Sequence, residues 1–178
     1  MARIVYGVSG EGSGHASRAR VVLEHLDLGG GLGIRYTDES PPEPAAYAAA
    51  LKQRLGERRY EILIEPARAI AGNAGILASR VLYTKKTQIK HFVIVDAAMN
   101  DLIRPALYGA YHRIEPVALN AASEETVDVV GAVCESSDVF GRDRRLGGLQ
   151  QGDMLCVLDA GAYGFSMSSN YNDHGRSA

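Results

Sequence analysis

Two glycine clusters are the first features of the sequence whose residue types could do chemistry. Gly10, Gly12 and Gly14 follow a short apolar run, and residues 29–33 read Gly-Gly-Gly-Leu-Gly. Consecutive glycines after a strand expose backbone N–H groups that a phosphate can approach closely. Neither cluster has the G-x-G-x-x-G dinucleotide spacing or the Gly-Lys-Ser/Thr of a Walker A loop. A tight turn without a ligand is an equally good interpretation of the glycines alone.

The sequence has few cysteines and histidines that could act as nucleophiles or ligands. A lone cysteine is more often a small buried residue than a catalyst, and Cys156, between two apolar residues, has that interpretation. Two cysteines are too few for a disulfide scaffold and indicate a reducing cytoplasm. We expect no metal site, because no metal-ligand spacing relates the histidines His25, His91, His112 and His174, which we interpret as structural or exposed.

The composition is that of an ordinary globular chain. With 178 residues, 46% hydrophobic and 22% charged, it predicts one domain or two small ones. A formal charge of −2, from 19 basic and 21 acidic residues, removes the electrostatic case for a nucleic-acid or anionic-membrane binder. No apolar stretch approaches the ~20 residues of a membrane-spanning helix. Residues 1–26 lack a signal-peptide pattern, so we expect a cytoplasmic protein.

Alternating strands and helices are predicted in the first half of the chain, and mostly β structure after about residue 75. The order of the first half argues for a parallel sheet or part of a barrel. We place a domain boundary near residues 72–80. The expected strands are 3–8, 26–28, 61–64, 81–83, 92–95, 127–133 and 154–158. The other expected elements are helices over 15–26, from Pro44 to about 57 and over 100–110 with Asn100 as its cap, a charged turn over 142–145 and a loose polar end over 171–178.

Five motifs in one order give the chain a family resemblance. They are LDLGGGLGI (26–34), EPAR (65–68), the run 96–111, CESSD (134–138) and DAGAYG (159–164). From about Leu23 to Asn172 the chain closely resembles the C-terminal part of diaminopimelate decarboxylase, a pyridoxal 5′-phosphate enzyme of lysine biosynthesis. The resemblance implies an α/β plus β architecture: a partial (α/β)₈ barrel segment over 23–78, followed by a mostly-β C-terminal substrate domain over 79–178.

The resemblance also implies roles for individual residues. The cofactor would contact Gly30, Gly31, Glu65, Ala67, Arg68 and Tyr163. The substrate would contact Arg68, Arg104, Tyr108, Glu135 and Tyr163. Arginine presents a planar fork suited to a carboxylate, and Glu135 suits the distal ammonium of diaminopimelate.

Cys134 would donate the proton that replaces CO₂. In this family Cys134, Glu135 and Tyr163 act on the neighbouring subunit, which implies a homodimer. One departure concerns Ala67, where the family usually has glycine. Its methyl group could obstruct the phosphate or demand a φ that alanine disfavours.

The resemblance leaves one catalytic requirement unmet. Carbon–carbon cleavage with pyridoxal phosphate needs a Schiff-base lysine. Lys52 is expected on an outward helical face and Lys85, Lys86 and Lys90 in a polar hairpin, and none has the Ala-x-Lys-Ala-Asn context of the family. We therefore expect no decarboxylation by this chain alone. Two or three strands cannot close an eight-stranded barrel, so we also expect an exposed apolar edge, with poor solubility or dimerisation through it.

Residues 1–22 form a separate segment by resemblance. Residues 4–8, followed by Gly10 to Arg18, look like the start of a GT-B glycosyltransferase, in which His15 would lie at the rim of the acceptor cleft. Two unrelated coding segments would then meet near residues 20–25.

The leading interpretation is a partial diaminopimelate decarboxylase that converts meso-2,6-diaminopimelate to L-lysine and CO₂. The alternatives are a related decarboxylase of ornithine or arginine, a non-catalytic chain that pairs with an intact decarboxylase subunit, and a glycosyltransferase remnant.

Overall fold

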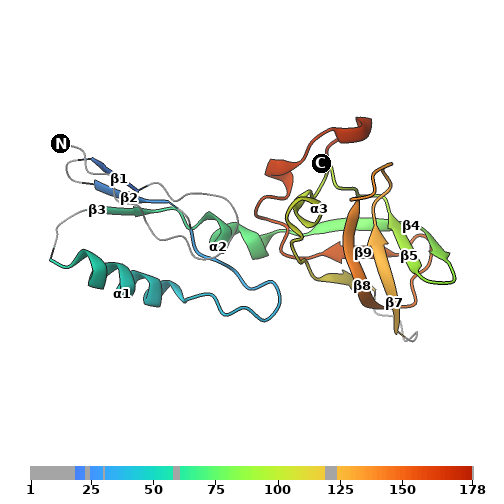
Figure 1. Cartoon of the computed structure of the whole chain (residues 1–178), viewed down its shortest axis with the longest axis horizontal. Coiled ribbons are helices and arrows are strands. Elements are labelled where there is room, and N and C mark those ends of the chain that lie inside the picture. Colours follow the sequence, from blue (N-terminus) through green and yellow to red (C-terminus); the bar gives the residue numbers. More distant parts are fainter. Residues whose placement is uncertain (1–18, 23–24, 30, 58–60, 119–123, 178) are drawn as a thin grey trace. The chain divides into compact units, whose positions relative to one another are not determined.

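The computed structural model describes residues 19–22, 25–29, 31–57, 61–118 and 124–177. The chain divides into two compact units, Met1–Ile70 and Ala71–Ala178, called unit 1 and unit 2 below (Figure 1).

Unit 1 contains a three-stranded sheet and one long helix. β1 (Ala19–Val22) pairs antiparallel with β2 (His25–Leu28), and β2 pairs in parallel with β3 (Glu61–Ile64). The crossover between the parallel strands contains α1 (Pro44–Leu55), which starts with a proline, a residue suited to the first turn because its missing N–H would be unpaired there anyway. The short helix α2 (Ala67–Ala71) follows β3. The expected helix from Pro44 and strand over 61–64 are confirmed.

The expected helix over residues 15–26 is wrong in its described part. Residues 19–22 form β1, and the register pairs Ala19 with Leu28 and Val22 with His25. Two consecutive β-branched valines favour a strand, and pairing with β2 outweighs the helical spacing of the apolar residues. The expected strand over 3–8 lies outside the described residues.

β3 is an apolar strand that remains in contact with solvent. Ile62, Leu63 and Ile64 are 38%, 48% and 44% exposed. Strands in parallel sheets are normally covered on both faces. Among the described side chains of unit 1, the buried hydrophobic ones are Leu28 and Leu32. The exposed apolar edge expected from the sequence is therefore present at β3.

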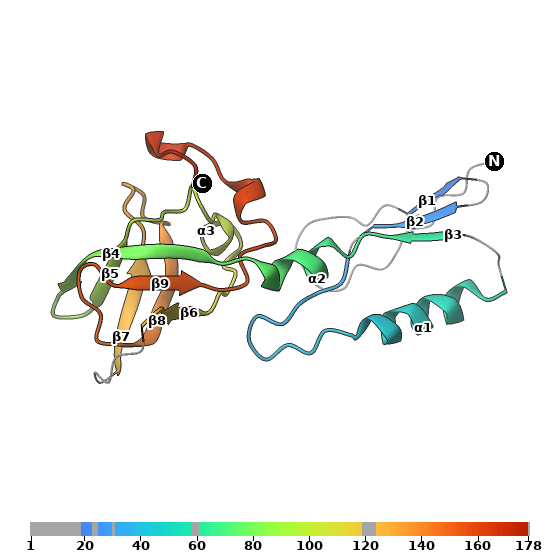
Figure 2. The same cartoon turned by 180° about the vertical axis from the view of Figure 1, so that it is seen from behind.

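Unit 2 is built on one six-stranded sheet in the order β6-β9-β4-β5-β7-β8. Only the β5–β7 pair is parallel within this sheet; the other neighbours are antiparallel. The outer strands β6 and β8 contact each other, so the sheet curls into a nearly closed barrel (Figure 2). The strands are β4 (Leu77–Lys86), β5 (His91–Val95), β6 (Ile114–Pro116), β7 (Glu124–Val130), β8 (Val139–Gly147) and β9 (Met154–Val157). The mostly-β second half is confirmed.

One apolar core fills this barrel. Val93 and Val95 on β5, and Val127 and Val129 on β7, are each at most 4% exposed. The spacing of two residues places each pair on one face of its strand. The same core includes Val81, Leu102, Ile114, Phe140, Leu146, Leu155, Val157 and Ala160. Leu102 and Ala160 lie in loops, so the core also anchors two segments that carry predicted site residues.

The structure corrects three local expectations in unit 2. The helix near 100–110 is only α3 (Arg104–Tyr108), with Ile103 as its N-cap, so Asn100 does not cap it. The charged turn expected over 142–145 lies within β8, where a bulge gives Asp143 a φ of 51° and the Asp143 N–H donates to the buried Asp128 carboxylate at 2.7 Å.

The C-terminal segment expected to be loose is instead bonded to the rest of unit 2. It contains the short helical turns η2 (Phe165–Met167) and η3 (Tyr171–Asp173). The Asn100 side chain donates to the carbonyl oxygens of Ser169 and Gly175, at 3.4 and 3.2 Å, and the Ser177 N–H donates to Asp101 Oδ1 at 3.2 Å.

Candidate functional site

The loop between β7 and β8 presents Cys134 and Glu135, and Asp138 shapes it. Asp138 Oδ1 accepts from the Met99 N–H at 2.7 Å, and Oδ2 accepts from the Val133 N–H at 3.1 Å. A side chain at Gly131 would overlap this carboxylate, so the close approach requires glycine there. Burial raises the pKa of Asp138, against the opposing effect of the two N–H donors. The result is a fixed loop with an exposed Cys134 thiol.

Glu135 is held as an anion at the mouth of this loop. Its Oε1 accepts from the Ser137 N–H at 3.3 Å, and its Oε2 accepts from the Tyr171 hydroxyl at 3.1 Å. The Ser137 N–H, followed by the Tyr171 hydroxyl, lowers the pKa of Glu135. A carboxylate in this state can receive an ammonium group.

Arg104 and Tyr108 lie one turn apart on α3. Arg104 is 7% exposed and its Nη1 donates to His112 Nε2 at 3.1 Å, whereas Tyr108 is 47% exposed. The loop that leads into α3 is tied to the Cys134 loop twice, by the Met99–Asp138 bond and by a 3.8 Å contact from Ser137 Oγ to Met99 Sδ. The structure thus places the α3 segment beside the segment of Cys134 and Glu135.

Tyr163 lies in a third segment that reaches the same region. Asp159 and Tyr163 both have left-handed φ angles, 57° and 60°. The segment packs tightly because a Cβ on Gly161 would overlap the Ala71 carbonyl, and one on Gly164 would meet the Ala160 carbonyl and lie 3.7 Å from Leu102 Cδ1. Tyr163 therefore stands on a rigid turn that packs against the loop before α3, with 39% of its surface exposed.

The predicted phosphate loops lie in unit 1, where the structure places Gly31 against the Glu65 backbone. Gly31 has a φ of 62°, and a Cβ there would lie 2.9 Å from the Glu65 carbonyl oxygen. Only glycine suits this approach. Ala67 begins α2 and has no left-handed φ, so the backbone does not exclude its methyl group. Arg68 follows on the same helix, and Gly30 lies outside the described residues.

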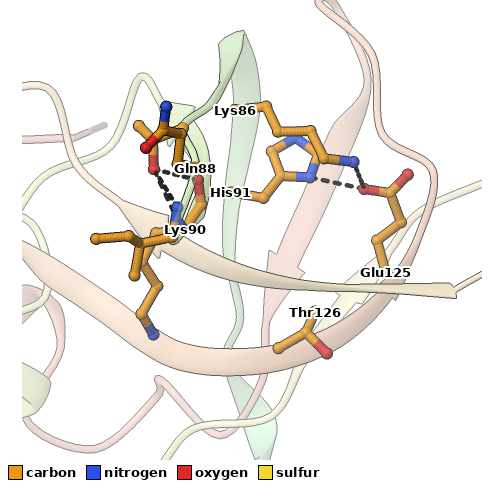
Figure 3. Close-up of a pocket in the computed structure, with 8 residues that line it drawn as sticks. Lys86, Gln88, Lys90, His91, Glu125 and Thr126 are labelled. Atoms are coloured by element: carbon orange, nitrogen blue, oxygen red, sulfur yellow. Dashed lines mark hydrogen bonds and ion pairs between the residues drawn. The ribbon is translucent and has the colours of Figure 1, made fainter.

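The pocket at the β4–β5 hairpin contains none of the predicted site residues (Figure 3). Figure 3 shows Lys86 and His91 directed at Glu125, with Lys86 Nζ and His91 Nδ1 at 3.4 and 2.8 Å from Glu125 Oε2. Lys90 pairs with Asp143 at 2.6 Å and with Asp128 at 3.3 Å. The lysine contacts are ion pairs that tie the hairpin to β7 and β8, and they engage two of the four lysines of the chain.

Sequence reasoning did not assign roles to Asp138, Tyr171 or His112, although all three support predicted site residues. Asp138 ends the CESSD motif, and a carboxylate four residues after Cys134 was an available signal. Tyr171 contacts Glu135, 36 positions earlier, and His112 contacts Arg104, 8 positions earlier. No local pattern indicates either contact. Among the described residues, no cluster of three His, Cys, Asp or Glu could hold a metal ion, and no helix has the length and hydropathy needed to cross a membrane.

The relatives of the chain are decarboxylases. It is 51% identical over 158 residues to a diaminopimelate decarboxylase from Neisseria meningitidis serogroup B, covering 89% of this chain and 38% of that protein. The identity is 55% over 157 residues to the Vibrio cholerae enzyme, covering 88% of this chain and 37% of the relative. The chain therefore spans about two fifths of the length of these relatives.

Solved structures give the same result. A protein from Aquifex aeolicus matches with a TM-score of 0.83 and 48% identity, covering 87% of this chain and 39% of that one. The diaminopimelate decarboxylase of Helicobacter pylori complexed with L-lysine matches with a TM-score of 0.81 and 42% identity, covering 86% of this chain and 38% of that one.

A family model described as "Pyridoxal-dependent decarboxylase, C-terminal sheet domain" matches residues 5–161. The match begins inside the segment that resembles a glycosyltransferase, and that resemblance gains no support; its residues 1–18, His15 included, lie outside the described ones. The chain belongs to the pyridoxal-dependent decarboxylase family.

Proposed function

We propose that this chain carries the substrate-reading part of a diaminopimelate decarboxylase, which converts meso-2,6-diaminopimelate to L-lysine and CO₂. The observation that carries the proposal is the convergence in unit 2 of α3, the Cys134 loop and the Tyr163 turn. These three segments carry the groups that the proposal uses, among them a guanidinium, a carboxylate held as an anion and an exposed thiol. Relatives about 50% identical to the chain carry the name of this activity.

Each residue has a defined task in this proposal. Arg104, with Tyr108 beside it, orients a substrate carboxylate through its planar fork. Glu135 receives the distal ammonium group, and Tyr163 contacts the substrate and cofactor. The Cys134 thiol delivers the proton to the α-carbon from which CO₂ departs.

The unit 1 loops suit the phosphate of pyridoxal 5′-phosphate. A Cβ on Gly31 would lie 2.9 Å from the Glu65 carbonyl oxygen, so the two loops approach each other closely. In this proposal the main-chain N–H groups of these loops donate to the phosphate. Gly30, Ala67 and Arg68 would complete the phosphate contacts. When bound, the cofactor supplies the electron sink for decarboxylation.

None of this chain's lysines is assigned to the cofactor aldehyde. Lys52 is exposed on α1, Lys85 is exposed on β4, and Lys86 and Lys90 form ion pairs in unit 2. We expect no release of CO₂ from carboxyl-labelled meso-diaminopimelate by this chain alone with added pyridoxal phosphate. Release at a rate typical of an enzyme would contradict that expectation.

The remaining assignments follow from the same proposal. Residues 23–78 would belong to a partial (α/β)₈ barrel and 79–178 to the substrate domain, with residues 1–22 as a separate N-terminal segment. The protein would act in the cytoplasm as a homodimer or paired with a full-length subunit, with Cys134, Glu135 and Tyr163 serving the neighbouring barrel.

Ligand titration tests the substrate assignment. Meso-diaminopimelate added to the ¹⁵N-labelled chain should shift amide signals in residues 98–108, 131–138 and 159–164. L-Lysine lacks only the carboxylate that leaves as CO₂ and keeps the distal carboxylate and ammonium groups, so Arg104→Lys and Glu135→Gln should each weaken the binding of both ligands. Tyr171→Phe, which removes one hydroxyl donor to Glu135, should have a smaller effect than Glu135→Gln. Shifts confined to the β4–β5 hairpin, or equal binding by wild type and Glu135→Gln, would refute the assignment.

A second candidate is a subunit that supports an intact decarboxylase without catalysing the reaction itself. The exposed Ile62, Leu63 and Ile64 of β3 favour it, because a partner could cover them. The chain would be mixed with a full-length decarboxylase whose motif cysteine is replaced by alanine. Restored CO₂ release that depends on Cys134, with a Cys134→Ala chain as the control, would establish donation across an interface. Absence of a complex in gel filtration would reject this candidate.

A further inference from the structure

His112 makes defined contacts through both ring nitrogens while fully buried. It is 0% exposed, between α3 and β6. Its Nδ1 lies 2.9 Å from the Leu158 carbonyl oxygen, and its Nε2 lies 3.1 Å from Arg104 Nη1. A carbonyl only accepts and a guanidinium only donates. The proton must therefore be on Nδ1, and Nε2 must offer its lone pair to Arg104.

The bond to His112 fixes the guanidinium and does not itself neutralise its charge. A carboxylate acceptor would neutralise the cation, whereas a neutral imidazole does not. Leu158 directly precedes the turn that carries Tyr163, so the same ring links α3 to that turn. One buried side chain thus sets the relation between two predicted substrate-contacting residues.

Burial, helped by two neighbouring cations, favours the neutral form of the ring. Burial is the main cause that lowers the pKa of His112, and the cations Arg104 on α3 and Arg144 on β8 lower it further. The Leu158 carbonyl and the Asp159 carboxylate oppose this effect. A protonated ring would direct an Nε2–H at the Arg104 guanidinium, which has no acceptor for it.

We propose that neutral His112 is a positioning residue that holds Arg104 toward the substrate carboxylate, and that binding of this carboxylate requires His112 to stay unprotonated. The proposal rests on the proposed function, which assigns Arg104 to that carboxylate. It adds a residue that does not touch the substrate and a dependence on pH.

The ring state is tested first, without ligand. Long-range ¹H–¹⁵N spectra of the labelled chain at pH 7 should show His112 as the neutral tautomer with its proton on Nδ1. A proton on Nε2, or a charged ring at this pH, overturns the proposal whatever the chain binds.

Matched variants then test the positioning role in titrations with meso-diaminopimelate. Asparagine places its amide near Nδ1, so His112→Asn keeps a donor for Leu158 and removes the acceptor for Arg104. We expect affinity to fall about tenfold, as for loss of a hydrogen bond to a charged group. Glutamine places its oxygen near Nε2, so His112→Gln should rescue affinity to within about threefold of wild type. Thermal melting confirms that both variants are folded.

The pH dependence of wild-type binding provides a further test, with His112→Gln as the control. The affinity of the wild-type chain for meso-diaminopimelate should fall as the pH is lowered from 8 through the His112 titration, which the same spectra follow, and His112→Gln should lack this fall. Affinity that stays constant while the wild-type ring titrates overturns the proposal.

A failure of this inference can be distinguished from a failure of the proposed function. If Arg104→Lys binds the ligand as wild type does, the carboxylate assignment of the proposed function is wrong and this inference falls with it. If Arg104→Lys loses binding while both His112 variants keep it, only the positioning role is wrong.

Discussion

The two units differ in how far their apolar strands are buried. In unit 2, Val93 and Val129 are 0% and 1% exposed inside a nearly closed barrel. In unit 1, Ile62, Leu63 and Ile64 on β3 are 38–48% exposed. Burial of apolar surface is the main favourable contribution to folding, worth roughly 25 cal/mol per Å². Unit 2 therefore has the core of a self-sufficient domain, whereas the described part of unit 1 does not.

This difference also divides the proposed chemistry. Four of the five groups assigned to the substrate stand on segments fixed by the unit 2 core and its buried hydrogen bonds: Arg104, Tyr108, Glu135 and Tyr163. The fifth, Arg68, lies on α2 in unit 1. The groups assigned to the cofactor phosphate, Gly31 and the backbone around Glu65, lie in unit 1. Substrate recognition should therefore be the more robust property of the chain.

Truncating one leucine in each unit should give the largest contrast in stability. Leu155 on β9 is 1% exposed, so Leu155→Ala should lower the free energy of unfolding by about 2–5 kcal/mol. Leu63 on β3 is 48% exposed, and Leu63→Ala should cost less than about 1 kcal/mol. Urea denaturation measures both. Equal losses would mean that β3 is as well packed as β9.

A methyl group at Gly161 should have the next largest effect. It would overlap the Ala71 carbonyl and approach the Gly75 backbone nitrogen, neither of which can move without displacing the chain. Gly161→Ala should destabilise unit 2 by about 1–3 kcal/mol. Gly175→Ala is the control, because a Cβ there meets no atom within 4 Å. A neutral Gly161→Ala would show that the Tyr163 turn is loosely held.

The pH dependence of stability should be the smallest effect and should belong to unit 2. Because the pKa of His112 is lowered from 6.5 in the folded state, the unfolded chain binds the proton more readily. The stability that neutral His112 contributes to the folded state is fully present above pH 6.5, and it is lost as the pH falls from there through the pKa of folded His112. Melting temperatures between pH 8 and 5 should fall more for wild type than for His112→Gln. Parallel curves would contradict this.

The sequence predicted the elements that have strong local signals. The helix from Pro44, the strand over 61–64 and the strands of unit 2 with consecutive valines follow from periodicity and turn residues. β1 was mistaken for a helix because its pairing with β2 is not visible in a local pattern. Residues 142–145 were mistaken for a turn because all four are charged, whereas the structure includes them in β8, which has a bulge there.

The candidate site was predictable where motifs identified it and not where it depends on distant partners. Cys134 and Glu135 followed from the family motif. Asp138, His112 and Tyr171 act through hydrogen bonds to Met99, Leu158 and Glu135, at sequence separations of 39, 46 and 36. Such contacts are set by tertiary packing, which the spacing of residues along the chain does not reveal.

Residue-resolved amide hydrogen exchange of the full chain tests most directly the claim that unit 2 is a self-sufficient domain and unit 1 is not. We expect amides of β4, β5, β7 and β9 to exchange only through global unfolding of unit 2, with one shared protection free energy, and amides of β3 to exchange much faster. Equal protection of β3 and β5 would contradict it.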